Sequence, residues 1–99
     1  MILKTFRKQP VEVKDYDIDY SPWLGAIGDT LDDFDFRVSI VDEPEVSDLL
    51  VQNHVITESK VKFWVSGGTS GKVYKVEVDA STVGGRLDES EIFFAVDDI

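Results

Sequence analysis

Residues 60–80, K-V-K-F-W-V-S-G-G-T-S-G-K-V-Y-K-V-E-V-D-A, decide the fold class of this 99-residue chain. Apolar side chains occupy every second position in both halves of the stretch: Val61, Phe63 and Val65, then Tyr74, Val76, Val78 and Ala80. Successive side chains of a strand point to opposite faces, so each half is predicted to be a strand with one buried face. Three glycines between the halves supply the positive φ angles that a reversal needs: Gly67, Gly68 and Gly71. We therefore interpret the stretch as a β-hairpin whose glycines have a structural role.

The same period of two recurs along the rest of the chain. We expect further strands at residues 1–8, 11–20, 34–41, 49–56 and 91–96. In residues 49–56 the predicted buried face consists of Leu49, Val51 and Val55. No window shows an apolar period of about 3.6 residues, so no helix is expected. About seven strands at intervals of roughly 8–12 residues are typical of an all-β fold, and we predict an immunoglobulin-like β-sandwich of antiparallel strands with Greek-key connections.

Two aromatic residues are expected to shape the ends of this core. Tyr74 lies at the start of its strand, where its ring can fill the core while its hydroxyl bonds to backbone at a corner, as in immunoglobulin-like domains. Trp23 follows a proline that ends the preceding strand, and it is predicted to fold back in a short turn that plugs one end of the core. A small β-barrel is the alternative architecture. We expect a single domain over residues 1–99, in which residues 1–10 form either an edge strand or an N-terminal arm.

The composition narrows the range of functions. Twenty acidic residues against ten basic residues give a net charge of −10, which disfavours binding to nucleic acids and to anionic membranes. The chain has no cysteine and a single histidine, His54, so disulfides, thiolate metal sites and histidine clusters are excluded. No apolar run approaches the ~20 residues that span a bilayer. We expect no catalytic residues, no metal and no cofactor, and a serine nucleophile is disfavoured because no G-x-S-x-G elbow is present.

Three aspartates alternate on one face of the strand expected at residues 11–20: Asp15, Asp17 and Asp19. We interpret them as a solvated face. Together with Asp29 or its acidic neighbours they could instead supply oxygen ligands to calcium, although the glycine and the distal glutamate of a calcium loop are missing. An acidic surface would also suit a soluble inhibitor that mimics DNA, which stays an alternative function.

Several residues are candidates for contact with a partner. Trp64 and Phe93 fall on the faces of their strands opposite to the buried side chains, and tryptophan is enriched among residues that dominate interface energies. Burial beneath the N-terminal segment is the other interpretation of both rings. The N-terminal segment carries cations and an aromatic anchor of its own, and its candidates are Lys4, Phe6, Arg7 and Lys8. A third function, carbohydrate binding, would use Trp64 or Trp23 as a stacking platform.

A set of short motifs resembles a family of small tail-associated proteins of tailed bacteriophages and prophages. The matching residues are K-Q-P at 8–10, D-Y-D-I-D-Y at 15–20 with Trp23-Leu24 following, G-D-T at 28–30, V-K-F-W-V-S-G-G-T-S-G at 61–71 with Tyr74-Lys75-Val76, and Gly85-Arg86. The most specific part is the segment W-[VL]-S-G-G-T-x-G-x-x-Y, which spans residues 64–74 here. The chain departs from the family pattern at residues 24–33, which are longer, and in its more acidic last strand.

The resemblance implies a virion protein of the fiber–tail adaptor or head–tail joining type, with an immunoglobulin-like sandwich and no catalytic residues. It implies partners among the tail, connector or fiber subunits of the phage, and a multi-copy ring in the assembled particle. On this interpretation the protein is made in the host cytoplasm and built into the virion, and neither nucleic acid nor membrane is a partner. The cationic residues 4–8 on an acidic body would suit head-to-tail contacts around such a ring.

Overall fold

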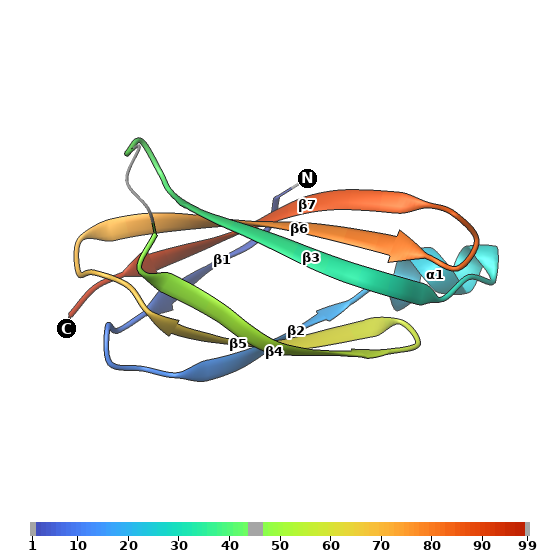
Figure 1. Cartoon of the computed structure of the whole chain (residues 1–99), viewed down its shortest axis with the longest axis horizontal. Helices are drawn as coiled ribbons and strands as arrows, with labels where there is room; N and C mark the ends of the chain where they lie inside the picture. The colour runs from blue at the N-terminus through green and yellow to red at the C-terminus, as the bar shows by residue number, and fades with distance from the viewer. Residues whose placement is uncertain (1, 44–46, 99) are drawn as a thin grey trace.

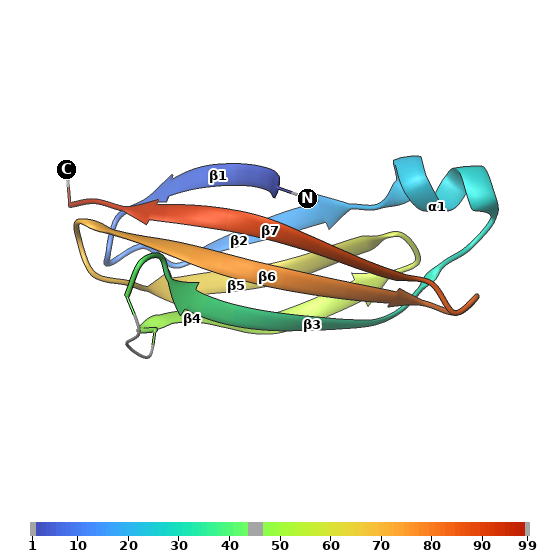
Figure 2. The same cartoon turned by 90° about the horizontal axis from the view of Figure 1, so that it is seen from above.

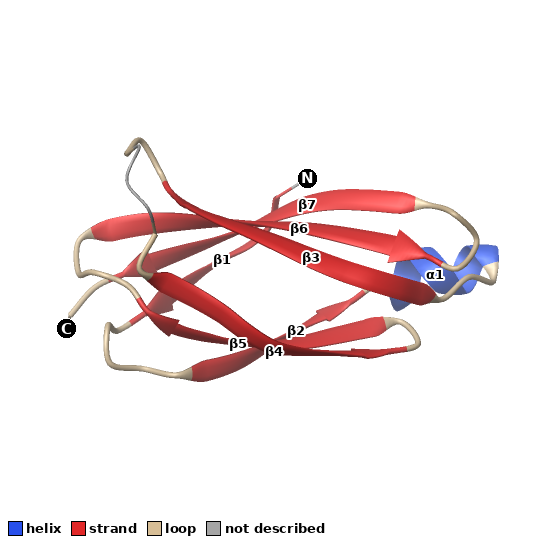
Figure 3. Cartoon of the chain, in the orientation of Figure 1, coloured by secondary structure: helices blue, strands red, loops and turns tan. Residues whose placement is uncertain are grey.

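The described part of the chain folds into two stacked β-sheets with one short helix at one end (Figure 1). The computed structural model describes residues 2–43 and 47–98, with side chains from Lys4 onward. The elements are β1 (Ile2–Lys8), β2 (Lys14–Asp19), α1 (Ser21–Ile27), β3 (Leu31–Ile40), β4 (Leu49–Thr57), β5 (Lys60–Gly67), β6 (Lys72–Thr82) and β7 (Leu87–Val96). Strands dominate the described part of the chain (Figure 3), which confirms the predicted all-β fold and its seven strands. None of the helical residues described here forms a segment with the length and apolarity that crossing a bilayer requires.

The strands form two layers that face each other across a core (Figure 1), and Figure 2 looks down onto the four-stranded sheet with the other sheet beneath it. One sheet has four strands in the order β1-β7-β6-β3, and the other has three in the order β2-β5-β4. The pairings are antiparallel except at β1, which runs parallel to β7 and places Phe6 beside Phe94. The prediction of an entirely antiparallel sandwich is therefore wrong at β1, because alternation of side chains indicates a strand but not its direction. Since β1 pairs only with β7, it forms one edge of its sheet.

β5 and β6 do not form the predicted hairpin. β5 pairs with β2 and β4, whereas β6 pairs with β3 and β7, so residues 68–71 cross from one sheet to the other. Alternation identifies the buried face of a strand, but it does not tell whether the next strand lies beside it or across the core. The hairpins of the fold are formed instead by β4 with β5, through Glu58 and Ser59, and by β6 with β7.

The core lies between the sheets and contains aromatic and β-branched side chains. Its fully enclosed members include every residue predicted from the alternation in residues 60–80: Val61, Phe63, Val65, Tyr74, Val76, Val78 and Ala80. An aromatic cluster extends the core toward β1, with ring centroids 4.6 Å apart for Phe6 and Tyr16 and 5.1 Å apart for Tyr16 and Phe94. Aromatic pairs at such separations add to the energy of area burial. This cluster therefore ties the edge strand β1 to strands of both sheets.

In β4 the predicted buried face is partly wrong. Leu49 is buried as expected, but Val55 is 56% exposed and Ile56 packs against the core in its place. The register with β5 shifts between Gln52 and Val55, and Asn53 has a φ of 56°. A bulge inserts an additional residue into the strand, so the alternation changes phase beyond it. Val55 is thereby turned to the outer face of the three-stranded sheet.

The short helix α1 occupies a region where a turn was expected. Pro22 lies in its first turn, where the missing N–H of proline has no intrahelical partner to lose. The helix ends at Gly28, which adopts the left-handed conformation with a φ of 64°. Leu24 is buried and Trp23 packs against the core, so these residues form the plug expected at one end of the sandwich. A helix of seven residues is too short to show a clear 3.6-residue period, which is why it was not predicted.

Replacing Gly67 with alanine should destabilise the fold more than replacing Gly71. Both glycines have positive φ, 78° and 88°, and a left-handed alanine costs about 1–2 kcal/mol at either position. A Cβ atom at Gly67 would lie 2.5 Å from the carbonyl oxygen of Asp48, whereas one at Gly71 would meet no atom within 4 Å. That clash should add about 1–3 kcal/mol to the loss in Gly67→Ala. Denaturant unfolding measures the difference, and equal losses would contradict the crossing geometry.

Candidate functional site

The end of the sandwich where the chain crosses from β5 to β6 is held by hydrogen bonds around Tyr74. The Tyr74 hydroxyl accepts a hydrogen bond from the backbone N–H of Thr69 (2.8 Å) and donates to the Asp48 carboxylate. The Thr69 hydroxyl donates to the same carboxylate (2.6 Å). This hydrogen bond has the largest effect on the pKa of Asp48, followed by the bond from Tyr74, and both lower that pKa. Burial, followed by the Asp48 contact, raises the pKa of Tyr74. Gly68 packs against Val96, where a Cβ atom would come within 2.9 Å of that side chain, so the crossing is closely packed.

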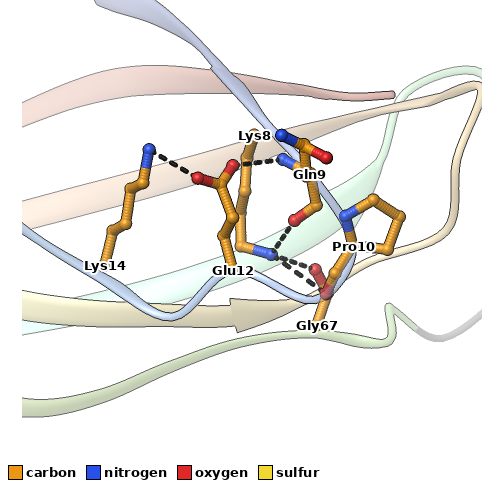
Figure 4. A network of polar contacts seen from close by, with 6 residues as sticks. All are labelled: Lys8, Gln9, Pro10, Glu12, Lys14 and Gly67. Atoms are coloured by element: carbon orange, nitrogen blue, oxygen red, sulfur yellow. Dashed lines mark hydrogen bonds and ion pairs between the residues drawn. The ribbon is translucent and has the colours of Figure 1, made fainter. Parts of the chain in front are cut away.

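Lys8 lies inside this end of the molecule and not on its surface. Its exposed fraction is only 2%, and its Nζ donates to the carbonyl oxygens of Gly67 (2.6 Å) and Gln9 (2.8 Å), with that of Pro10 at 3.4 Å (Figure 4). These oxygens replace the water that an ammonium group loses on burial. Burial also lowers the pKa of Lys8. Lys8 thus links β1 to the end of β5, and it is not available as the surface contact that the sequence suggested.

Glu12 orders the loop between β1 and β2. Its carboxylate accepts a hydrogen bond from the backbone N–H of Gln9 (2.7 Å) and pairs with the Nζ of Lys14 (2.7 Å) (Figure 4). The contact with Lys14, followed by the hydrogen bond from Gln9, lowers the pKa of Glu12. The Glu12 carboxylate in turn raises the pKa of Lys14. The loop still exposes its two valines, Val11 and Val13, to solvent. This end of the molecule therefore combines a fixed backbone with exposed apolar side chains.

The other N-terminal candidates divide between the core and the surface. Phe6 packs into the aromatic cluster of the core, and the Nζ of Lys4 lies 5.0 Å from its ring centroid. Arg7 is exposed and pairs with Asp97 at 3.0 Å. Exposed ion pairs of this kind contribute little to stability. Of the four N-terminal candidates, Lys4 and Arg7 are exposed, Phe6 is partly buried and Lys8 is buried.

Trp64 and Phe93 lie on the outer faces of different sheets, and the structure does not bring them together. Trp64 belongs to β5, the central strand of the three-stranded sheet, and is 40% exposed. Phe93 belongs to β7, is partly buried, and lies between Thr5 of β1 and Lys75 of β6. β1 adds to the edge of the four-stranded sheet and does not cross either outer face. Burial beneath an N-terminal segment therefore does not explain the position of either ring.

The outer faces of the two sheets differ in how their side chains are paired. The four-stranded sheet carries a network of ion pairs at 2.9–3.6 Å, formed by Arg37, Lys75, Glu77 and Asp79. The three-stranded sheet has the ion pair of Lys62 with Asp15 at 3.5 Å, and it exposes two apolar side chains diagonally across from Trp64, namely Leu50 and Val55. The sequence did not indicate Val55 because the bulge in β4 reverses the side to which it points. The outward position of Leu50 follows from its alternation with buried Leu49.

The residues considered for catalysis or metal binding do not converge. The ring of His54 is exposed and lies 5.3 Å from that of Phe36. Three aspartates face outward from β2 beside residues of β5: Asp15, Asp17 and Asp19. Within residues 2–43 and 47–98, no three histidine, cysteine or acidic side chains are placed to hold a metal ion.

Asp29 holds the opposite end of the sandwich, at the exit from α1. Its carboxylate accepts hydrogen bonds from the backbone N–H groups of Thr30 (2.9 Å) and Gly84 (3.0 Å), and it pairs with Arg86 (2.9 Å). The pKa of Asp29 is lowered to about 2 by hydrogen bonding, most strongly by the hydroxyl of Thr82 and further by the donors just named. The network joins the loop after α1 to the β6–β7 hairpin.

Comparison with known families finds one match that covers most of the chain. A family model described as "Podophage GP4 fiber-tail adaptor protein gp77" matches residues 8–95. The matched region begins at the last residue of β1 and includes β2 to β6, α1 and most of β7. A search among curated proteins found no match. The exposed N-terminal candidates, Lys4 and Arg7, lie outside the matched region.

Replacing Lys8 with methionine should destabilise the protein, whereas the same change at Lys4 should not. Lys8→Met keeps the length of the buried side chain but leaves the carbonyl oxygens of Gly67 and Gln9 without their donor, which should cost about 1–3 kcal/mol. Lys4→Met changes an exposed lysine four residues earlier on the same strand, and should stay within about 0.5 kcal/mol of the unmodified protein. Urea unfolding of both variants tests this, and equal stabilities would show that the buried ammonium group does not hold the sheets together.

Replacing Asp29 with asparagine should remove a stabilisation that depends on pH. Because the pKa of Asp29 in the folded state is lowered from 3.8 to about 2, the unfolded chain binds the proton more tightly. The carboxylate therefore stabilises the fold above about pH 4–5, and this effect is lost as the pH falls toward about 2. The difference in stability between the unmodified protein and Asp29→Asn should be constant near neutral pH and shrink over that acidic range. Denaturant unfolding in a pH series measures it, and a difference that grows on acidification would contradict the assignment.

Proposed function

Because this chain belongs to the podophage GP4 fiber-tail adaptor protein gp77 family, we propose that it holds a fiber protein and a tail protein of a phage together through protein–protein contacts and without catalysis. Membership of the family makes it a structural component of the phage tail and hence of the virion. The observation that carries the proposal is the family match over residues 8–95. The fold supports it, because a rigid two-layer sandwich presents two outer faces on opposite sides.

The polar networks of the molecule support a role without catalysis or cofactor. Tyr74 and Lys8 at one end, and Asp29 at the other, direct their hydrogen bonds to backbone and side chains of the fold itself. Groups engaged in this way serve to connect elements. A catalytic group, in contrast, has to face a site that a substrate can enter.

We also assign the chain to a single immunoglobulin-like domain over residues 1–99. Support comes from Tyr74, since a buried tyrosine whose hydroxyl bonds to backbone near a corner is a feature of such sandwiches. The face-to-face packing of a four-stranded and a three-stranded sheet supports the same assignment. The connectivity differs from a simple meander because β5 and β6 belong to different sheets.

The proposed contacts lie on the candidates that remain once Phe6 and Lys8, whose side chains point into the fold, are set aside. They are Lys4 and Arg7 on the edge strand β1, Trp64 on one outer face and Phe93 on the other. In a multi-copy ring, the cationic edge of one copy would meet the acidic surface of the next. The net charge of −10 favours basic protein partners over nucleic acids and anionic membranes.

Deleting the gene from the phage that encodes this protein should give particles without fibers. Loss of the adaptor removes the contact between fiber and tail, so infectivity should fall and should return when the gene is supplied in trans. Electron microscopy and mass spectrometry of purified particles measure fiber content. Supply of Val83→Ser, a change at an exposed hairpin position, should restore fibers as the unmodified gene does. Particles that keep their fibers without this protein would refute the proposed role.

A further inference from the structure

The outer face of the three-stranded sheet, called the open face below, changes in character across its width. On its β2 side it presents three aspartates, Asp15, Asp17 and Asp19. On its β4 side it presents Leu50 and Val55, and the central strand β5 carries Lys62 and Trp64 between them. The register places Val55 beside Lys62 on one side and Asp17 beside Lys62 on the other. The open face is thus acidic along one edge and apolar along the other.

The apolar side of the open face is uncovered and lies beside a hollow. Leu50, Val55 and Trp64 are 50%, 56% and 40% exposed. Val55 also borders a solvent-open hollow of about 430 Å³, whose other lining residues are Asp17, Thr57, Lys60 and Lys62. Neighbouring exposed apolar side chains mark interaction surfaces, particularly where they include tryptophan. On the four-stranded sheet the exposed apolar side chains, Val73 and Leu87, lie at opposite ends of the β6–β7 pair, and the ion-pair network around Arg37 and Glu77 lies between them.

A second copy of this chain does not suit the open face. An isologous dimer places the same surface on both partners. With the two-fold axis along the strands, β5 would lie over β5 and bring Lys62 opposite its own equivalent. With the axis across the strands, β2 would lie over β2 and bring its aspartates opposite their own equivalents. Both arrangements juxtapose like charges between molecules that each carry a net charge of −10, which opposes association.

The acidic edge also has a carboxylate that is available to a partner. Asp15 already contacts Lys62 at 3.5 Å, and Asp19 accepts a hydrogen bond from the backbone N–H of Ser21 at 2.9 Å. Asp17, between them, forms no hydrogen bond or ion pair with any other described residue. A basic side chain that approaches the middle of this edge would therefore find an exposed carboxylate next to the hollow.

We propose that the open face binds a different protein, whose contacting surface is apolar at its centre and basic along one side. Apolar side chains of that partner cover Val55 and Trp64, one of them entering the hollow, and a lysine or arginine faces Asp17. This inference rests on the proposed adaptor function. It specifies the surface chemistry of one of the two proteins that the adaptor joins. It also says that this protein binds to the three-stranded sheet.

The test compares variants of the open face with matched variants of the other sheet. Val55→Ser and Trp64→Ser remove exposed apolar contacts, and Asp17→Lys reverses the available charge. Leu87→Ser and Asp32→Lys make the same kinds of change at exposed positions of the four-stranded sheet. Thermal unfolding establishes which variants keep the fold; if Trp64→Ser does not, Val55→Ser and Asp17→Lys carry the test.

Binding of the purified variants to the recombinant fiber and tail proteins of the same phage is measured by biolayer interferometry at low and physiological salt. The unmodified protein should bind at least one of them. Val55→Ser, Trp64→Ser and Asp17→Lys should weaken that binding about tenfold or more, whereas the two control variants stay within about twofold. The loss in Asp17→Lys should be larger at low salt, because screening weakens contacts between exposed charges.

Three outcomes would overturn the inference, and they can be told apart. If Val55→Ser and Asp17→Lys bind like the unmodified protein, the open face is not the contact, while the adaptor role stands. If sedimentation shows a dimer that Val55→Ser dissociates, the face belongs to a second copy. If the unmodified protein binds neither recombinant protein and is missing from purified particles, the proposed function fails as well.

Discussion

The passage of the chain from β5 to β6 is the constraint on which the two-layer structure depends. Stacked sheets lie about 10 Å apart, and residues 68–71 have to cover that distance while both strands keep their apolar side chains turned inward. The crossing is held by the Tyr74 hydroxyl, which accepts the N–H of Thr69, and by Lys8, whose ammonium group binds the carbonyl oxygen of Gly67. Tyr74 belongs to one sheet and Gly67 to the other. The two layers are therefore joined where no strand pairing connects them.

The sequence predicts which residues are buried better than which strands are neighbours. Alternation in residues 60–80 identifies the enclosed side chains, because burial of one face is a property of each strand by itself. The pairing of a strand depends in addition on the path of its connections, so the expected hairpin is in fact a crossing between sheets. The parallel direction of β1 and the bulge near Asn53 likewise depend on more than one strand. The bulge turns the side chain of Val55 from the inner to the outer face of its sheet. Neither feature has a local signature in the sequence.

The candidate contact residues show the same division between local and distant causes. The outward position of Trp64 follows from its place between buried Phe63 and Val65. The same rule puts Lys8 on the inward face of β1 with Phe6, although its charge argues for the surface. Alternation alone does not identify Lys8 as buried, because it puts Lys4 on the same face of β1, and Lys4 is exposed. Burial of Lys8 needs the carbonyl oxygen of Gly67, which lies 59 positions away and is brought near only by the complete fold.

The contacts that stabilise this fold are separate from the face that we assign to a partner. The networks around Tyr74 and Asp29 lie at the two ends of the sandwich, whereas Val55, Trp64 and Asp17 point outward from the three strands of the smaller sheet. Substitutions on the open face can therefore change its affinity for a partner at little cost to stability. Because strand pairing already orders the backbone beneath it, association has to immobilise side chains but not a loop, which reduces the entropic cost of binding. A pre-ordered sheet whose outer side chains are free to vary is suited to an adaptor that has to match a particular fiber or tail surface.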